Sequence, residues 1–253
     1  IFYYPIPTGG PLYKYYLDGV PCCVIIAPTD NMNKFYNSFI PESFIHHEFD
    51  ITILQKVLIR QKNIIKKNEK RKIEGKRLID PRIVIVMDDC LSEKDKWIKD
   101  RTIREIFFNG RHYYIIFIMS LQFSLGLSTE LRNNVDYAFL LSDYISSNKE
   151  RLYKHYAGIF PNLNSFEKVF DKLTQNYQCM VIDNKLASPD ILKKVYWYKA
   201  EDIWNIKFQF GSNKFKEYNT KKLNVNYEDN NEIKICKIED LKNNKLNVNI
   251  GII

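Results

Sequence analysis

The sequence predicts an α/β fold whose central sheet is mostly parallel and is covered by helices on both faces. Short apolar runs of strand length alternate with helical patterns along most of the chain. One of these runs, residues 83–87, is wholly apolar, as expected of a parallel strand buried on both faces. The 253 residues are 45% hydrophobic and 14% aromatic, which is enough to form a substantial core.

The first elements are predicted from aromatic and apolar runs separated by turn residues. Residues 1–6 are predicted as a strand, 11–18 as a short helix and 22–27 as a second strand that ends in the turn Pro28-Thr29-Asp30. The longest helical pattern covers residues 51–77, and only its first half carries apolar residues at helical spacing. We therefore expect the first half to pack and the second half to project into solvent.

The remaining elements follow the strand at 83–87, which ends in Asp88-Asp89. A helix is predicted from Trp97 to Phe107, because apolar residues recur there at close to helical spacing. Further strands are predicted at residues 113–119, 135–141, 177–183 and 195–198, and further helices at 148–156 and 164–173. We expect a core domain at residues 1–200 with a projecting basic arm at 56–80, and an Asn- and Lys-rich extension at 201–253.

The positive charge of the chain is concentrated in one segment. The formal net charge is +8, and residues 56–77 contain ten basic and two acidic residues. The basic residues at the centre of this segment are Lys66, Lys67, Lys70, Arg71 and Lys72. Such a cluster predicts contact with a polyanion, most often nucleic acid, although a solvated helix face is the alternative.

Cysteine usage and hydropathy limit the class of protein. The five cysteines are an odd number without CxxC spacing, which favours a reducing compartment over a disulfide framework or a zinc site. No window approaches eighteen uninterrupted apolar residues, so membrane insertion is not expected. The first residues lack a basic region followed by a cleavage site, so we expect no secretory signal.

The apolar strand at 83–87 and the two acids after it form a Walker B pattern. A rigid strand of this kind places carboxylates beside the phosphates of a nucleotide. We predict that Asp88 holds Mg²⁺ through its water shell and that Asp89 acts either as the base or as the residue that orients the attacking water. The alternative is an apolar strand that happens to end in a polar turn.

Two further residues are candidates for the same site. Gln122 follows the predicted strand at 113–119, so it is expected at the same sheet edge as Asp88, where it would sense the γ-phosphate or position water. Arg132 precedes the strand at 135–141 and is a candidate to reach a phosphate in its own or a neighbouring subunit. Read alone, Gln122 is a turn residue and Arg132 a surface arginine.

The expected Walker A motif, G-x-x-x-x-G-K-[ST], is absent from the chain. The candidate in the corresponding place has Gly10 where the motif has lysine and Pro11 where it has a hydroxyl. We expect a remnant phosphate loop formed by Thr8, Gly9 and Gly10, with Lys14 one helical turn later as a weak substitute for the missing lysine. Proline at position 11 suits the first turn of a helix.

These residues together resemble the packaging ATPases of nucleocytoplasmic large DNA viruses, a branch of the FtsK–HerA group of P-loop motors. The resemblance extends to about Ala200, and its blocks occur in a specific order and spacing. The blocks are Cys22 to Asp30, Asn33-Lys34-Phe35-Tyr36, Phe39-Ile40-Pro41, Ile85-Val86-Met87-Asp88-Asp89-Cys90, Asn109-Gly110-Arg111-His112, Met119-Ser120-Leu121-Gln122, Leu131-Arg132-Asn133-Asn134-Val135-Asp136-Tyr137, Tyr156-Ala157-Gly158-Ile159-Phe160-Pro161, Asn176-Tyr177, Val181-Ile182-Asp183-Asn184 and Trp197-Tyr198-Lys199-Ala200.

The resemblance implies a RecA-like P-loop ATPase that uses ATP and Mg²⁺. It implies a homo-oligomeric ring that drives double-stranded DNA, without sequence preference, into a preformed capsid through a portal-like vertex. It also implies that Asp88 and Asp89 are the Walker B acids, Gln122 the polar sensor and Arg132 an arginine finger. The expected location is the host cytoplasm, in a viral factory, or the virion.

Other functions remain open at this stage. The missing Walker A lysine favours a catalytically inactive DNA-binding or ring-scaffold homologue, whereas the intact Walker B pair favours an ATPase whose N-terminal sequence is altered or truncated. A third alternative is a P-loop kinase or other NTPase that acts on a small molecule.

Overall fold

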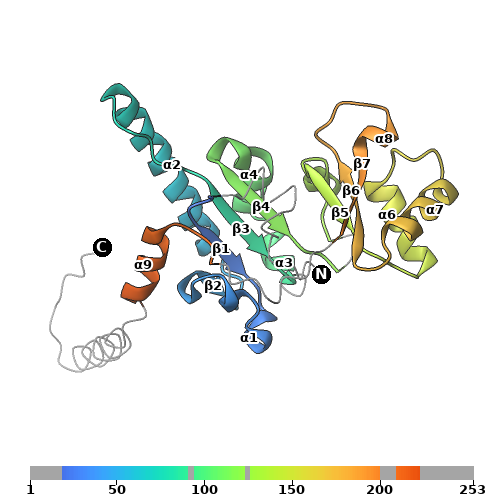
Figure 1. The fold of residues 1–253 in the computed structure, drawn as a ribbon, viewed down its shortest axis with the longest axis horizontal. Coiled ribbons are helices and arrows are strands. Elements are labelled where there is room, and N and C mark those ends of the chain that lie inside the picture. The colour runs from blue at the N-terminus through green and yellow to red at the C-terminus, as the bar shows by residue number, and fades with distance from the viewer. Residues whose placement is uncertain (1–18, 91–93, 123–125, 200–208, 223–253) are drawn as a thin grey trace. The chain divides into compact units, whose positions relative to one another are not determined.

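A computed structural model describes residues 19–90, 94–122, 126–199 and 209–222 (Figure 1). Its contacts divide the chain into two units, Ile1–Ser212 and Asn213–Ile253. The strand predicted at residues 1–6 and the helix predicted at 11–18 lie outside the described residues.

Four parallel strands form the first sheet, in the order β2-β1-β3-β4. They are β1 (Cys23–Ile26), β2 (Ile45–His46), β3 (Ile83–Met87) and β4 (Ile115–Met119). Ile26 is aligned with Met87, and Met87 with Met119. Because the three strands are parallel and in register, β1, β3 and β4 end together at one edge of the sheet.

Helices connect these strands. The connection from β1 to β2 contains α1 (Asp30–Asn33), η2 (Tyr36–Ser38) and η3 (Glu42–Phe44); α2 (Ile51–Ile73) leads to β3; and α3 (Lys94–Trp97), α4 (Arg101–Asn109) and η5 (Gly110–Tyr113) lead to β4. The helix α2 contacts both α4 and η5. This parallel sheet flanked by helices confirms the predicted fold class.

The prediction of one helix from Trp97 to Phe107 was wrong, since two helices occupy this region. Asp100 separates them: its backbone is extended, and its carboxylate accepts a hydrogen bond of 2.6 Å from the backbone N–H of Thr102. The local side-chain cap thus starts a new helix where the apolar spacing predicted continuity. The next strand begins at Ile115 instead of residue 113, because η5 extends the helical segment to Tyr113.

The last three strands form a separate antiparallel sheet, in the order β5-β6-β7. They are β5 (Tyr137–Leu140), β6 (Gln178–Asp183) and β7 (Val195–Lys199). We predicted these strands within a mostly parallel sheet, and this part of the prediction was wrong. The burial of β5 alternates along the strand, as is common in antiparallel sheets, whereas parallel strands are generally buried on both faces.

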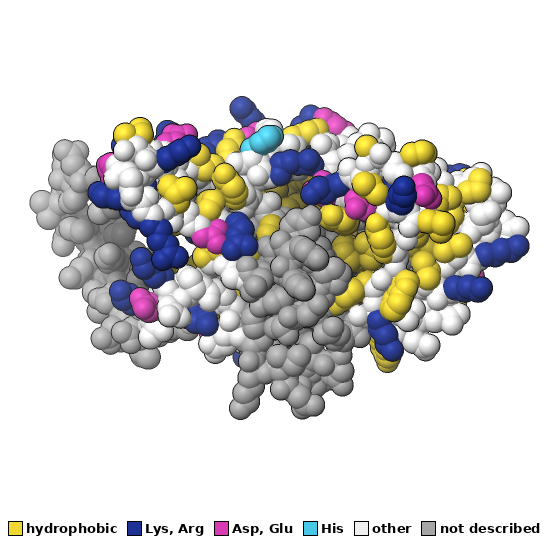
Figure 2. Space-filling view, turned by 45° about the horizontal axis from the view of Figure 1, so that its top comes forward, with side chains coloured by type: hydrophobic (Ala, Val, Ile, Leu, Met, Phe, Trp, Pro, Cys, Tyr) yellow, Lys and Arg dark blue, Asp and Glu magenta, His cyan; other side chains and the backbone are white. Residues whose placement is uncertain are grey.

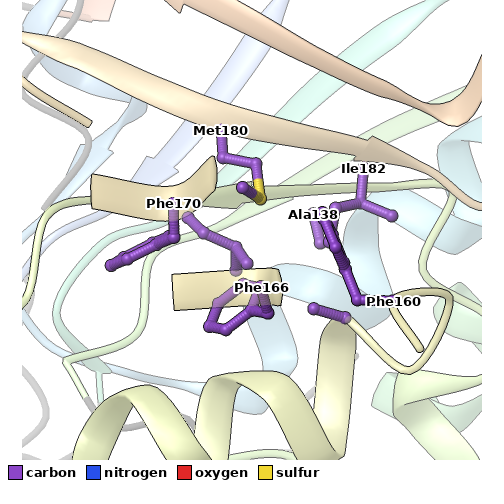
Figure 3. Packing of buried hydrophobic residues seen from close by; sticks show 8 residues of the cluster. Ala138, Phe160, Phe166, Phe170, Met180 and Ile182 are labelled. Atoms are coloured by element: carbon purple, nitrogen blue, oxygen red, sulfur yellow. The ribbon is translucent and has the colours of Figure 1, made fainter. Parts of the chain in front are cut away.

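The antiparallel sheet has its own apolar core, which it forms with α6 (Ser146–Tyr156) and α7 (Leu163–Leu173) (Figure 3). Phe166 and Phe170 of α7 are stacked with ring centroids 5.1 Å apart. The buried cluster consists of Ala138, Leu140, Ala157, Phe160, Phe166, Phe170, Met180 and Ile182. The strands in this region are joined to further short helices, α5 (Thr129–Arg132) before β5 and α8 (Ile191–Lys194) before β7.

The region predicted as a C-terminal extension is partly described. Phe210 is buried, and its N–H donates to the carbonyl of Phe39, while the N–H of Ser212 donates to the carbonyl of Pro21. In the second unit, α9 covers Asn213–Lys222, and residues 200–208 and 223–253 lie outside the described part of the chain. None of the helices within the described residues is both long and apolar enough to span a bilayer.

Candidate active site

Polar residues gather where β1, β3 and β4 end. Thr29 and Asp30 follow β1, Asp88 and Asp89 follow β3, and the segment from Ser120 to Gln122 follows β4. The backbone continues the pairing one step beyond the strands, since the N–H of Asp88 donates to the carbonyl of Ile26 at 2.8 Å and that of Ser120 to the carbonyl of Met87 at 3.0 Å. The sheet thereby holds the predicted acids and the predicted amide at one edge.

Asp88 is buried, with 8% of its surface exposed, and both of its carboxylate oxygens accept hydrogen bonds. The hydroxyl of Tyr36 donates to Oδ2 at 3.0 Å, and the hydroxyl of Ser120 donates to Oδ1. A buried carboxylate needs such donors, because its desolvation is otherwise unfavourable. Two hydroxyls from different connections therefore fix this side chain.

Asp89 has a left-handed backbone conformation, with φ of 54°. Its N–H donates to the Ser120 hydroxyl at 3.1 Å, and its carboxylate Oδ1 accepts a hydrogen bond of 2.6 Å from the Gln122 amide. The Ser120 hydroxyl thus accepts from one acidic residue and donates to the other, so it links the two acids directly.

The electrostatic environment of Asp89 differs from that of an ordinary surface carboxylate. Burial raises the pKa of Asp89, the negative charge of Asp88 raises it further, and a hydrogen bond with the Thr29 side chain opposes the shift. A carboxylate with a raised pKa is a stronger base than an ordinary aspartate. Asp89 therefore has the properties of a proton acceptor.

Sequence reasoning gave no role to Ser120 or Tyr36. Ser120 was detectable, because it follows β4 directly and the matched ends of two parallel strands place it beside Asp88. Tyr36 carried no such signal, since it lies 52 residues before the carboxylate that it binds. Only the folded connection between β1 and β2 brings its hydroxyl to the site.

The remaining predicted site residues are those of the phosphate loop and Arg132. Thr8, Gly9, Gly10 and Lys14, the predicted remnant of the phosphate loop, lie outside the described residues. The guanidinium of Arg132 donates to the Leu127 carbonyl at 2.6 Å and to the Thr129 hydroxyl at 2.9 Å, so these bonds hold it at the start of its own short helix.

The predicted basic arm at 56–80 covers α2 from Lys56 to Ile73 and the segment that follows the helix. Lys66, Lys67, Lys70 and Lys72 are exposed, and Arg71 is half-buried, with its Nε donating to the Arg77 carbonyl at 2.6 Å. Lys and Arg side chains are frequent over the α2 end of the view in Figure 2. The arm therefore presents positive charge to solvent.

Two amide side chains attach α2 to the segments that enter β3 and β4. The fully buried Gln61 donates to the carbonyls of Pro81 at 2.7 Å and Tyr113 at 2.6 Å. Asn68 forms a reciprocal pair with the backbone of Ile79, at 2.7 and 2.8 Å. These bonds join the helix that carries the basic arm to both strands that deliver the site residues.

No family model matches the chain. It is 44% identical to uncharacterized protein L437 of Acanthamoeba polyphaga mimivirus over 242 residues, covering 94% of this chain and 84% of that protein. It is 30% identical to uncharacterized protein 088R of Invertebrate iridescent virus 3 over 206 residues, covering 81% and 75%.

A similar solved structure is the genome packaging NTPase B204 from Sulfolobus turreted icosahedral virus 2 in complex with sulfate. The TM-score is 0.51 at 15% identity, and the match covers 79% of this chain and 88% of that chain. At this identity the likeness concerns the fold alone. The chain belongs to the family of large-DNA-virus proteins that includes mimivirus L437 and iridescent virus 088R.

Proposed function

We propose that this chain is the ATPase of a viral DNA-packaging motor, in which hydrolysis of ATP drives translocation of double-stranded DNA. The observation that carries the proposal is the pair of acids at the end of β3, tied to the end of β4 by the Ser120 hydroxyl and the Gln122 amide. A fold shared with a packaging NTPase supports it. Within P-loop proteins, we assign the chain to the FtsK–HerA branch.

In this proposal Asp89 accepts the proton of the water that attacks the γ-phosphate. Its raised pKa suits a general base, and its bond to Gln122 orients the carboxylate. Gln122 has a second amide proton and a carbonyl oxygen, which suit it to hold the water or to detect the γ-phosphate.

Asp88 would hold Mg²⁺ in the same site. The site offers carboxylate and hydroxyl oxygens, and no group of three or more His, Cys, Asp or Glu residues suited to a metal occurs in the described ranges. One or two carboxylates beside substrate phosphates is the donor set that Mg²⁺ prefers, so the residues fit this ion. When bound, Mg²⁺ would neutralise charge on the phosphates.

The proposed phosphate loop has Gly10 and Pro11 where a Walker A motif has lysine and a hydroxyl residue. Thr8, Gly9 and Gly10 would contact the phosphates through their backbone, and Lys14, four residues after Gly10 in the sequence, would substitute weakly for the missing lysine. The absence of the Walker A lysine and hydroxyl favours a second candidate, a catalytically inactive DNA-binding or scaffold subunit of the same ring. The acid pair favours the ATPase, because an inactive subunit has no physical need for two adjacent carboxylates.

Arg132 would act as an arginine finger between neighbouring subunits of a homo-oligomeric ring. Its hydrogen bonds to Leu127 and Thr129 hold the guanidinium at a fixed position on its own subunit. These bonds use two of the five N–H groups of the guanidinium, so three would be available to a phosphate in a neighbour's site. The ring would engage a portal-like capsid vertex, either in the viral factory of the host cytoplasm or in the virion.

The basic arm supplies the proposed contact with DNA. Lys66, Lys67, Lys70, Arg71 and Lys72 would contact phosphates and not base edges, so binding would be independent of sequence and sensitive to salt. An NTPase that acts on a small molecule has no use for such an arm.

The catalytic assignment is tested by a steady-state ATPase assay. The phosphate loop is first restored with Gly10→Lys and Pro11→Ser, and Asp89→Asn is then added. Loss of the general base is expected to lower the rate by about 10²–10⁴-fold. Equal rates with and without Asp89→Asn would refute the assignment. Calorimetry with Mg²⁺-ATP on the unaltered chain separates the two candidates, because micromolar binding weakens the scaffold alternative.

The DNA contact is tested by the salt dependence of binding to a duplex. Replacing the five basic residues of the arm with Gln is expected to reduce the slope of log K against log salt by up to about 4.5. A matched control removes five positive charges from the antiparallel-sheet region by replacing five lysines with Gln. These are Lys168, Lys172, Lys185, Lys193 and Lys194. Unchanged affinity in the arm variant, or an equal loss in the control, would contradict the proposal.

A further inference from the structure

The Asp88 carboxylate is bound by the hydroxyl of Tyr36, a residue that is not part of the Walker B pattern. Tyr36 belongs to η2, in the connection between β1 and β2, and its hydroxyl reaches Asp88 Oδ2 at 3.0 Å. The tyrosine is itself buried, with 5% of its surface exposed. A buried phenol is stabilised by a hydrogen-bond acceptor, and here it has a carboxylate, which forms a stronger bond than a neutral acceptor does.

A second buried acid places Tyr36. Asp30, 5% exposed, follows β1 and accepts hydrogen bonds from the backbone N–H groups of Phe35 at 2.8 Å and Tyr36 at 3.3 Å. The ring of Phe35 packs edge-on against Tyr36 with the centroids 5.2 Å apart. The end of β1 thus orients Tyr36 toward the acid at the end of the adjacent strand.

An aspartate at the end of a strand has a broad rotational preference about its last bond, so its carboxylate plane is poorly defined without partners. Here each oxygen accepts one hydroxyl, and the hydroxyls come from opposite neighbours of β3: Tyr36 from the β1 side and Ser120 from the β4 side. A carboxylate oxygen has two lone pairs, so each oxygen keeps one for a water molecule of the Mg²⁺ shell.

We propose that Tyr36 and Ser120 are positioning residues that together hold the Asp88 carboxylate in the orientation required for Mg²⁺-dependent nucleotide binding. This inference rests on the proposed ATPase function, because it assigns a role within the same site. Both hydroxyls donate to Asp88, and the Ser120 hydroxyl also accepts from the N–H of Asp89. Removal of the two hydroxyls therefore has different consequences.

The first test removes the Tyr36 hydroxyl with Tyr36→Phe in the loop-restored chain, which keeps the ring in the core. The Mg²⁺ concentration for half-maximal ATPase rate is expected to rise about tenfold, with KM for ATP at saturating Mg²⁺ unchanged. Tyr153→Phe is the matched control, because that hydroxyl donates to the Phe160 carbonyl at 3.4 Å in the antiparallel-sheet region. An equal Mg²⁺ dependence in Tyr36→Phe and Tyr153→Phe would overturn the inference.

Ser120 is tested with a pair of variants. Ser120→Ala removes the hydroxyl and is expected to lower kcat as well as raise the Mg²⁺ requirement, since it also releases the Asp89 backbone. Ser120→Thr keeps the hydroxyl and is expected to restore both parameters to within about threefold. The inference fails if Ser120→Thr, with an unchanged circular dichroism spectrum, does not restore kcat and the Mg²⁺ requirement. That result would exclude the hydroxyl as the cause of the loss in Ser120→Ala.

A binding measurement separates this inference from the proposed hydrolysis. Calorimetry gives the affinity for a non-hydrolysable ATP analogue with Mg²⁺ and with EDTA, and Tyr36→Phe is expected to reduce the ratio of the two affinities about tenfold. If the chain binds but never hydrolyses, the proposed function fails, while a reduced ratio still supports the positioning role. An unchanged ratio overturns the positioning role, and a chain that does not bind nucleotide overturns both.

Discussion

The two sheets of this protein place their polar residues differently. In the parallel sheet, β1, β3 and β4 end together. Asp88 and Asp89, which follow β3, are hydrogen-bonded to Ser120 and Gln122, which follow β4. The antiparallel sheet reverses direction at each strand, so neighbouring strands end at opposite edges, and its best-defined feature is the apolar cluster with α6 and α7. Parallel topology thus concentrates chemistry at one edge, whereas the antiparallel sheet contributes a packed core.

The largest expected effect concerns the apolar core of the antiparallel sheet. Phe166 is fully buried in the antiparallel-sheet cluster, so Phe166→Ala is expected to lower the free energy of unfolding by about 3–5 kcal/mol. Urea denaturation measures the loss, and Phe166→Leu, which fills more of the space, should show a smaller one. Hydrogen exchange should show the lost protection in β6 and not in β3. Equal loss in both strands would mean that the two sheets unfold as one unit.

A smaller effect tests the polar connections of the parallel sheet. Gln61→Leu removes the donor to the Pro81 and Tyr113 carbonyls and is expected to cost about 1–3 kcal/mol, because buried acceptors lose a partner. Asn63→Leu at an exposed position of the same helix is the control and should change stability little. Urea denaturation measures the free energy of unfolding of both variants. If both lose a similar amount, the hydrogen bonds of the Gln61 amide are not the cause.

The smallest effect concerns the charge of Asp89 and its dependence on pH. Because folding raises the pKa of Asp89, its contribution to stability is present below the unfolded pKa and is lost as the pH rises through the folded pKa. Asp89→Asn should therefore stabilise the protein slightly at neutral pH and flatten this decline. Thermal unfolding between pH 3 and 8 measures it, and parallel curves for both proteins would contradict the raised pKa.

The elements that the sequence predicts best are those determined by local composition. The predicted strand at 83–87 agrees with β3, and the predicted helix at 164–173 differs from α7 by one residue. The two-residue β2 was too short to detect, and the pairing of β5 with β6 depends on how distant segments pack. Apolar runs identify strands, but they do not determine which strands become neighbours.

The same limit applies to the site. Asp88, Asp89 and Gln122 were found from their positions at strand ends, and the structure brings Gln122 to Asp89. Tyr36 was not found, because its bond to Asp88 arises from the path of the chain through η2. The roles of all these residues, and of Arg132 and the basic arm, stay predictions, and the experiments above address those of Asp89, Tyr36 and the arm.

The left-handed backbone of Asp89 limits which replacements are informative at this position. Asn, Asp and Gly adopt such a conformation readily, whereas a longer side chain is less tolerant of it. Asp89→Glu would keep the carboxylate but strain the turn, and its extra methylene group would change the geometry of the bond with the Gln122 amide. A loss of activity in Asp89→Glu would therefore have two causes that cannot be separated. The substitution that preserves charge is thus a poorer probe of this acid than the one that removes it.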